Sequence, residues 1–353
     1  MVPMWTVPIA LVMGNTVLLK PSEKCPLTCS MITEIIKEAG FPPGVWNIVN
    51  GTREACESII DSPLVKAVTF VGSSPIARIV SERCHGLNKR VIALGGAKNH
   101  LVALKDAELE GTTRDVVASF AGASGQRCMA ASVLLVVGEN EELIQNVVER
   151  AKGLELGTGK GEMGPVIDKH SFDKVRSYIE DSEKAGAKIL LDGRNKTVPE
   201  GGGNWIGPTV ILHSKGGDKA LHDEIFGPVL SILKVNTWQD AVAIENGNPF
   251  GNAACIYTTK GGSADWFTTR FRAGMLGVNV GIPVPREPFA FGGLYGTLSK
   301  YGDGDITGEG AIEFFSARVK ITARWPAPDE EEVGGKEDVS SVVIDHANFN
   351  GRM

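Results

Sequence analysis

The alternation of short apolar runs with amphipathic segments constrains the fold of this chain more than any other feature. Runs rich in β-branched and aliphatic side chains predict buried strands at residues 16–20, 44–51, 65–71 and 89–94. Apolar residues at helical spacing predict intervening helices at residues 26–39, 53–61 and 75–84. This order predicts a mainly parallel, doubly wound α/β sheet, and ligands bind such sheets beyond the carboxyl ends of the strands.

Residues 98–285 predict a second α/β unit, since a chain of 353 residues is long enough for about two domains. The expected strands are 131–137, 187–191, 205–212, 224–233 and 253–257, and the expected helices are 106–120, 140–152 and 169–185. The alternating run 317–324 predicts an edge strand with one charged face, suited to pairing between subunits. We expect the acidic stretch 326–353, which has few large apolar residues, to be disordered.

Composition and charge argue against several classes of protein. The net charge of −6 disfavours nucleic acid or an anionic membrane as the main partner. No apolar run reaches the roughly 18 residues of a membrane-spanning helix, and the first residues lack the pattern of a targeting peptide. The 6 cysteines lack metal-ligand spacing, which predicts reduced thiols of an intracellular protein and no metal site.

Cys128 is the candidate nucleophile. Residues 121–125 ahead of it are all glycine, alanine or serine, so the backbone can turn tightly and leave N–H groups free to stabilise an oxyanion. Arg127 beside it would favour the thiolate, which is the nucleophilic form of cysteine. A buried structural cysteine is the alternative, and the Gly-Gln-Arg-Cys context disfavours it.

Polar residues follow two of the predicted strands at the edge where a ligand would bind. Lys20 and Glu23 follow the first strand, and Ser73 follows the third. No Gly-x-Gly-x-x-Gly turn joins a strand to a helix in residues 1–97, so Gly72 and Ser73 at a helix start are the candidate phosphate site. For Lys20, Glu23 or Ser73 taken alone, the alternative is an ordinary solvent-exposed turn residue that binds no ligand.

Six motifs in order give the chain a resemblance to the aldehyde dehydrogenase superfamily over about residues 1–325. They are Leu-Leu-Lys-Pro-Ser-Glu at 18–23, Phe-Val-Gly-Ser at 70–73, Gly-Ala-Lys-Asn-His at 96–100, Gly-Gln-Arg-Cys-Met at 125–129, Glu-Ile-Phe-Gly-Pro-Val at 224–229 and Val-Asn-Val-Gly-Ile-Pro-Val-Pro at 278–285. The third and fourth motifs resemble the CoA-acylating branch, which acts on methylmalonate and malonate semialdehydes. The resemblance implies two doubly wound α/β domains and a C-terminal oligomerisation strand.

The resemblance also implies a domain order. Residues 1–97 would be an NAD-binding domain whose N-terminal part lies upstream of Met1 and is missing from this chain. Residues 98–285 would be the catalytic domain, 286–325 the C-terminal oligomerisation segment, and 326–353 an acidic tail. A homotetramer built as a dimer of dimers is the assembly that the resemblance implies.

Individual roles follow from the matched motifs. Cys128 would attack the aldehyde and carry the acyl group as a thioester after hydride transfer to NAD. The cofactor-binding residues that the resemblance implies are Lys20, Glu23 and Lys24 at the adenosine ribose, Ser73 at the pyrophosphate, Glu224 at the nicotinamide ribose and Phe226 near the ring. Glu23 would accept the ribose 2′-hydroxyl and repel a 2′-phosphate, which favours NAD over NADP.

Leu94 marks an informative difference from hydrolytic members of the superfamily. Those enzymes carry Glu-Leu-Gly-Gly-Lys, whose glutamate activates the water that cleaves the thioester. The lysine corresponds to Lys98 here, and the position of the glutamate is taken by Leu94, which cannot accept a proton. An acyl-enzyme without that base should hydrolyse slowly and await coenzyme A, a thiol that needs less help from a base.

Arg127 is the candidate substrate-binding residue, because its guanidinium could hold the substrate carboxylate in a bidentate pair. A thiolate-tuning or purely structural role is the alternative. The family adds a second arginine and an oxyanion-hole asparagine upstream of the segment that begins at Met1. Residues 286–304 depart from the family pattern, which puts substrate contacts from Phe289 and Phe291 in doubt.

Together the motifs favour an NAD-dependent, CoA-acylating semialdehyde dehydrogenase that releases propionyl-CoA or acetyl-CoA and carbon dioxide. The resemblance implies a place in the catabolism of valine and related compounds, and a mitochondrial location in eukaryotes. A hydrolytic aldehyde dehydrogenase and a non-catalytic fragment acting through subunit association are the alternatives.

Overall fold

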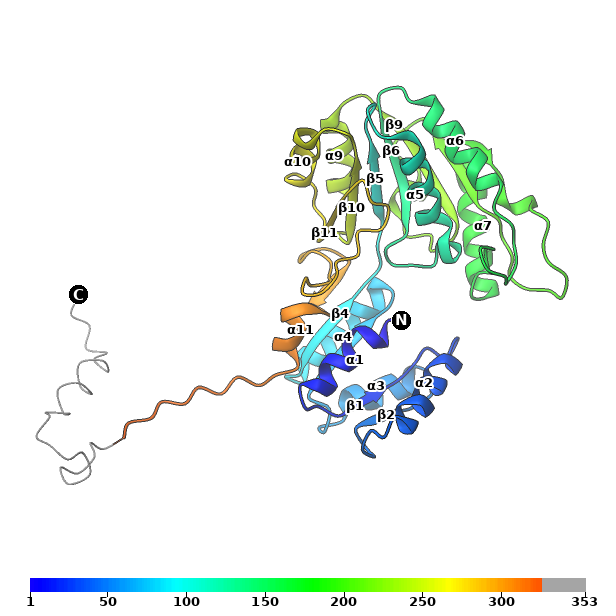
Figure 1. Ribbon diagram of the computed structural model, residues 1–353. Helices are drawn as coiled ribbons and strands as arrows, with labels where there is room; N and C mark the ends of the chain where they lie inside the picture. The colour runs from blue at the N-terminus through cyan, green and yellow to red at the C-terminus, as the bar shows by residue number, and fades with distance from the viewer. Residues whose placement is uncertain (326–353) are drawn as a thin grey trace, which may run out of the picture. The chain divides into compact units, whose positions relative to one another are not determined.

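The computed structural model describes residues 1–325, and its strands form three separate sheets (Figure 1). β1 (Val17–Leu19) and β2 (Trp46–Ile48) pair in parallel by themselves. β3 (Ala67–Val71) and β4 (Arg90–Leu94) pair in parallel, and β12 (Lys300–Gly302) joins β4 antiparallel. The expected single N-terminal sheet is therefore wrong: no described strand bridges β1–β2 to β3–β4, so Lys20 and Ser73 follow strands of different sheets.

A seven-stranded sheet in the order β11-β10-β5-β6-β9-β8-β7 forms the centre of the fold. Its strands are β5 (Asn99–Ala103), β6 (Ala131–Val137), β7 (Lys188–Leu191), β8 (Thr209–His213), β9 (Val229–Val235), β10 (Ala253–Tyr257) and β11 (Met275–Val278). All neighbours are parallel except β7 and β8. The inner strands are almost wholly apolar because both of their faces are buried.

Helices cover both faces of this sheet, as expected for a doubly wound fold. α5 (Leu109–Ala121) and α6 (Glu141–Lys152) pack on the face that carries Leu101, whereas α9 (Trp238–Gly247) and α10 (Gly261–Thr268) pack on the opposite face, which carries Val102 (Figure 1). Successive side chains along a strand point to opposite faces of the sheet, and the core is therefore divided into these two layers.

The remaining elements surround these sheets. They are α1 (Pro3–Val12), α2 (Leu27–Glu38), α3 (Arg53–Asp61), α4 (Ser74–Gly86), the 3-10 turns η1 (Gly122–Gly125) and η2 (Gly193–Asn195), α7 (Lys169–Lys184), α8 (Lys219–His222) and α11 (Gly308–Phe314). Arg90 holds α11 against β4, because its guanidinium donates to the carbonyls of Phe314 at 2.9 Å and Ser316 at 2.5 Å. A cation at a helix C-terminus satisfies carbonyls that have no partner within the helix.

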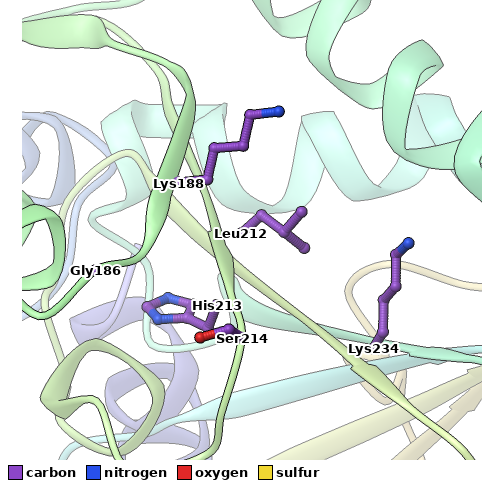
Figure 2. A pocket seen from close by; sticks show the side chains of 6 residues that line it. All are labelled: Gly186, Lys188, Leu212, His213, Ser214 and Lys234. Carbon is purple, nitrogen blue, oxygen red and sulfur yellow. The ribbon is translucent and has the colours of Figure 1, made fainter.

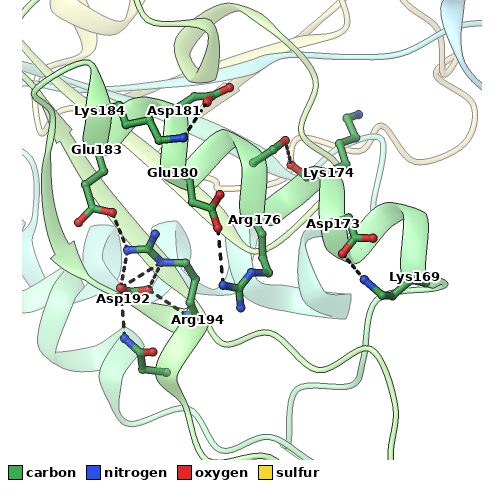
Figure 3. A network of polar contacts seen from close by, with 12 residues as sticks. Lys169, Asp173, Lys174, Arg176, Glu180, Asp181, Glu183, Lys184, Asp192 and Arg194 are labelled. Carbon is green, nitrogen blue, oxygen red and sulfur yellow. Dashed lines mark hydrogen bonds and ion pairs between the residues drawn. The ribbon is translucent and has the colours of Figure 1, made fainter.

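α7 is anchored by burial rather than by its surface charges. Figure 3 shows the polar contacts on and beside it: the pairs Lys169–Asp173, Arg176–Glu180 and Lys184–Asp181, and Arg194 bonded to Asp192 and Glu183. Exposed pairs of this kind contribute only about 0.3–0.5 kcal/mol each. Val175 and Ile179 on the inner face are fully buried, so they fix the position of the helix.

The strand expected at 317–324 is absent from the structure. Contacts group Met1–Ser316 into one unit, and the described residues after it, 317–325, are exposed and belong to no helix or strand. A strand needs a partner edge, and none pairs with this segment within residues 1–325. The expected disordered tail lies outside the described residues, and the predicted domain boundaries stay predictions. None of the helices in residues 1–325 has the length and apolar character to cross a membrane.

Phe267 should be a sensitive test of the packing of α9 and α10. Its ring is fully buried and lies 4.9 Å from Trp266, 5.4 Å from Trp238 and 5.5 Å from Phe271 between ring centroids. We expect Phe267→Ala to lower the free energy of unfolding by about 3–5 kcal/mol in urea titrations, because it leaves a cavity. The control Phe289→Ala, at a ring that is 71% exposed, should change it by less than about 0.5 kcal/mol. Equal effects would contradict this packing.

Candidate active site

The loop that presents Cys128 is held in a tight left-handed turn between α5 and β6. Ala123, Ser124 and Gly125 all have positive φ angles, of 50°, 55° and 69°. A Cβ atom at Gly125 would lie 2.1 Å from the carbonyl oxygen of Gly227, so the loop and the segment before β9 approach too closely for any other residue. The tight turn expected from the sequence is confirmed.

The side-chain amide of Asn99 fixes the backbone of the nucleophile. Its Nδ2 donates to the carbonyls of Cys128 at 2.8 Å and Ala130 at 2.9 Å. Its Oδ1 accepts from Asn252 Nδ2 at 3.2 Å and from the backbone N–H of Ala253 at 3.1 Å. Asn252 Nδ2 also reaches the Cys128 carbonyl, at 3.1 Å. From the sequence we predicted no role for Asn99, which lies in one of the motifs, and we did not identify Asn252. Asparagines whose amides are buried beside a nucleophile loop are a signal that could have found both.

Cys128 is half-buried, and its environment keeps the sulfur mostly as the thiol. Burial raises the pKa of the Cys128 thiol, the backbone N–H groups of Met129 and Cys128 lower it, and the negative field of Glu224 raises it. The two N–H groups that act on the sulfur belong to Cys128 and Met129, which follow the glycine-rich turn. The thiolate fraction of Cys128 is therefore small at neutral pH.

The guanidinium of Arg127 lies against Gly122, in the turn that precedes Cys128. A Cβ atom at Gly122 would lie 2.6 Å from Arg127 Nη2, so the guanidinium stacks over that glycine. Within residues 1–325 the guanidinium makes no ion pair or hydrogen bond. The causes that shift the pKa of Cys128 do not include Arg127, which removes support from the thiolate-tuning alternative.

Glu224 is held beside the segment that connects β4 to β5. Its Oε1 accepts the backbone N–H of Ala97 at 2.9 Å, and a Cβ atom at Gly96 would lie 2.6 Å from its Oε2. Burial raises the pKa of this carboxyl, while the Ala97 N–H, Lys174 and Lys98 lower it. Phe226, two residues on, is 42% exposed with a φ of 58°, so its ring is available to a ligand.

Lys20, Glu23 and Lys24 lie together beyond the end of β1. Lys20 Nζ is 3.3 Å from Glu23 Oε2 and donates to the carbonyl of Gly51 at 3.1 Å. A backbone hydrogen bond and the Lys20 ammonium lower the pKa of the Glu23 carboxyl. Lys24 Nζ reaches Asp168 Oδ2 at 2.5 Å, which ties this edge to the N-terminus of α7.

Ser73 is the exposed residue that precedes α4, and its neighbour Ser74 joins that helix to the Glu224 contact. Ser73 makes no side-chain cap, so its hydroxyl is free for a ligand at the helix N-terminus. Ser74 Oγ accepts the backbone N–H of Gly96 at 2.9 Å and donates to the carbonyl of Leu298 at 2.6 Å. The sequence did not single out Ser74.

Leu94 and Phe291 belong to the apolar surroundings of Cys128, whereas Phe289 does not. Leu94 is 5% exposed and belongs to the apolar cluster of Met129 and Phe291, against which Cys128 packs. Phe291 lies in this core and its ring centroid is 4.7 Å from that of Trp5. Phe289 is 71% exposed. The ring of Phe291 is buried in the core and the ring of Phe289 is exposed, and both positions support the doubt that these residues contact the substrate.

Comparisons with known proteins identify the family of this chain. The aldehyde dehydrogenase family model matches residues 1–320. The chain is 41% identical over 329 residues to malonate-semialdehyde dehydrogenase 1 of Geobacillus thermodenitrificans, covering 92% of this chain and 68% of that protein. It is 42% identical to malonate-semialdehyde dehydrogenase 2 of Bacillus thuringiensis, over 92% and 67% of the two lengths.

Two solved structures are similar at the level of the fold. The crystal structure of methylmalonate-semialdehyde dehydrogenase from Oceanimonas doudoroffii has a TM-score of 0.90 and 38% identity, over 93% of this chain and 68% of that one. A Sinorhizobium meliloti protein assigned to the same activity and solved with NAD has a TM-score of 0.90 and 36% identity, over 94% and 68%. These relatives are bacterial, which gives the expected mitochondrial location no support. The chain belongs to the aldehyde dehydrogenase family.

Proposed function

We propose that this chain is an NAD-dependent, CoA-acylating dehydrogenase of methylmalonate or malonate semialdehyde. The observation that carries the proposal is the Cys128 site, where Asn99 fixes the backbone of the cysteine and Leu94, in the place of a hydrolytic base, belongs to the apolar cluster against which Cys128 packs. The names of the relatives support the choice of semialdehyde.

The residues around the cofactor edge fit a dinucleotide. Gly96 lets the Glu224 carboxylate approach the backbone between β4 and β5, Lys20 and Glu23 form a donor–acceptor pair, and the exposed Ser73 precedes a helix of 13 residues. We assign Lys20, Glu23 and Lys24 to the adenosine ribose, Ser73 to the pyrophosphate, Glu224 to the nicotinamide ribose and Phe226 to the nicotinamide ring. NAD, when bound, supplies the hydride acceptor.

Cys128 forms the covalent bond to the substrate. Its sulfur attacks the aldehyde carbon as the thiol proton passes to the aldehyde oxygen, and the N–H groups of Cys128 and Met129 stabilise the negative charge that develops in this step. Loss of hydride and of the hydroxyl proton from the resulting adduct leaves a thioester on Cys128. The Asn99 hydrogen bonds keep the carbonyl of Cys128 fixed through these steps, so the sulfur does not drift from its donors.

Arg127 holds the carboxylate of the substrate in this proposal. Its guanidinium lies within the nucleophile loop and has no ion pair within the described residues, so it can accept a carboxylate without breaking an existing contact. Once the thioester has formed, the carboxylate is β to its carbonyl, and that carbonyl accepts the electron pair released with carbon dioxide. Protonation of the α-carbon then yields the propionyl or acetyl thioester.

Coenzyme A completes the reaction by thiol exchange. Its sulfur displaces Cys128 from the acyl group, and the CoA thiol proton passes to the Cys128 sulfur. The full conversion of the semialdehyde, NAD and CoA to acyl-CoA, NADH and carbon dioxide releases no net proton, because the hydroxyl proton balances the one added to carbon. The enzyme acts as a homo-oligomer in this proposal, with the extended residues 317–325 available to a partner.

Cys128 should be essential for turnover. We expect Cys128→Ala to lower CoA-dependent NADH formation from methylmalonate semialdehyde by about three orders of magnitude, because no other group can carry the acyl chain. The matched control Cys56→Ala removes another partly buried thiol and should retain activity. Turnover by Cys128→Ala, measured by absorbance of NADH, would refute this mechanism.

Leu94→Glu should introduce hydrolysis. A carboxylate there would activate water against the thioester, so we expect NADH formation without CoA to rise by about 10²-fold. Burial raises the pKa of such a carboxyl, so the gain should increase with pH as the base ionises. Leu94→Gln has nearly the same shape and no base, and it should show no gain. An equal gain in both variants would show that Leu94 does not stand in for the base.

A further inference from the structure

The two lysines at the edge beyond β1 are each held by a carboxylate. Lys20 Nζ lies 3.3 Å from Glu23 Oε2, and Lys24 Nζ lies 2.5 Å from Asp168 Oδ2. We refer to Lys20, Glu23, Lys24 and Asp168 as the β1 edge cluster. The cluster carries two positive and two negative charges, so it suits an uncharged hydroxyl better than an added phosphate.

Asp168 is held in place by α7, 144 residues further along the chain than Lys24. It is the N-cap of this helix, and its Oδ1 accepts the backbone N–H of Ser171 at 2.8 Å. The other oxygen, Oδ2, accepts from the Lys24 ammonium. Because capping fixes the carboxylate, it keeps its position beside Lys24 better than an uncapped surface side chain would.

The Asp168 carboxylate is charged at neutral pH. The Lys24 ammonium and the Ser171 N–H hold the pKa of Asp168 well below its usual range. The backbone hydrogen bond and the Lys20 ammonium lower the pKa of Glu23, and the field of Lys24 adds to both. Lys24 is therefore shared between two carboxylates, while its side chain stays 48% exposed and within reach of a ligand.

A 2′-phosphate at this edge would have to compete for Lys24. A phosphate oxygen that accepts from Lys24 Nζ at an ordinary distance comes within about 5 Å of Asp168 Oδ2, because the ammonium already lies against that oxygen. Like charges at such a separation repel each other. A 2′-hydroxyl has no charge, so Asp168 does not oppose it.

We propose that Asp168 is a specificity-determining residue, which engages Lys24 and thereby disfavours nucleotides that carry a 2′-phosphate. The adenosine ribose lies beside Lys20, Glu23 and Lys24 only on the proposed function, on which this role of Asp168 therefore rests. Glu23 would repel a 2′-phosphate by its own charge, whereas Asp168 acts through Lys24. The two contributions can be separated for that reason.

Binding of nucleotide fragments to the full chain tests this role without turnover. Adenosine 2′,5′-bisphosphate carries the 2′-phosphate, and 5′-AMP lacks it. Asp168→Asn removes the charge but keeps an N-cap, because asparagine caps a helix about as well as aspartate. In calorimetric titrations we expect this variant to bind the bisphosphate about tenfold more tightly than wild type, with 5′-AMP changed by less than about twofold. Asp168→Ser, which also caps and is uncharged, should show the same gain.

The gain should depend on Asp168 and not on any acidic residue of α7. Asp173 lies on the same helix and pairs with Lys169, so Asp173→Asn removes a comparable exposed charge away from Lys24. We expect this control to leave both affinities unchanged. Equal gains in Asp173→Asn and Asp168→Asn would overturn the specific role of Asp168.

The gain should also require Lys24. Adding Lys24→Met to Asp168→Asn should abolish it, because no freed ammonium is left for the phosphate. The matched control is Lys188→Met in the same background, which should retain the gain. Lys188 lines a surface hollow of about 320 Å³ on β7, and Figure 2 shows its side chain extending away from the ring of His213. A gain that survives Lys24→Met would show that Asp168 does not act through Lys24.

The outcomes distinguish this role from the proposed function. If wild type binds NAD and 5′-AMP while Asp168→Asn and Asp168→Ser bind the bisphosphate no better, the role of Asp168 is refuted and the proposed function stands. If wild type binds neither NAD nor 5′-AMP, both are refuted.

Discussion

The hydrogen bonds of Asn99 are the interaction on which the arrangement of the site depends. This residue begins β5, a central strand, and its amide uses both donors and both acceptor positions within the core. It thereby joins the Cys128 loop to β5 and to the start of β10. Each such bond contributes only about 1 kcal/mol net, so its main effect is geometric. The loop contains consecutive left-handed residues, and a strained turn keeps one conformation only where its surroundings hold it.

The structure brings together several residues that the sequence analysis singled out, whereas its sheets differ from the predicted ones. Cys128 and Glu224 belong to glycine-rich, motif-like segments, and the structure brings both to the segment between β4 and β5. β6 matches its expected range because seven consecutive small or apolar residues leave no doubt about a buried strand. β5 was missed because Asn99 and His100 read as polar, although both are buried by tertiary hydrogen bonding and packing. The antiparallel partner of β4 was missed because β12 is only three residues long.

Spacing in the sequence cannot reveal the contacts that two residues make. Arg127 is adjacent to Cys128 in sequence, and its guanidinium stacks over Gly122. Ser73 attracted attention as a helix-start serine, whereas the buried Ser74 makes the structural bonds to Gly96 and Leu298. The strand expected at 317–324 illustrates a third limit, because an edge strand forms only where another edge is present.

On the proposed function, the apolar side chain of Leu94 explains how the site selects a thiol over water. At pH 7.5 a thiol with a pKa of about 8.5 is about one-tenth thiolate. Water, with a pKa of about 15.7, needs a base to become a comparable nucleophile. Leu94 places an apolar side chain in the cluster against which Cys128 packs, so the acyl group meets no carboxylate on that side. On the proposed function, the absence of a base at Leu94 is then the source of the preference for coenzyme A.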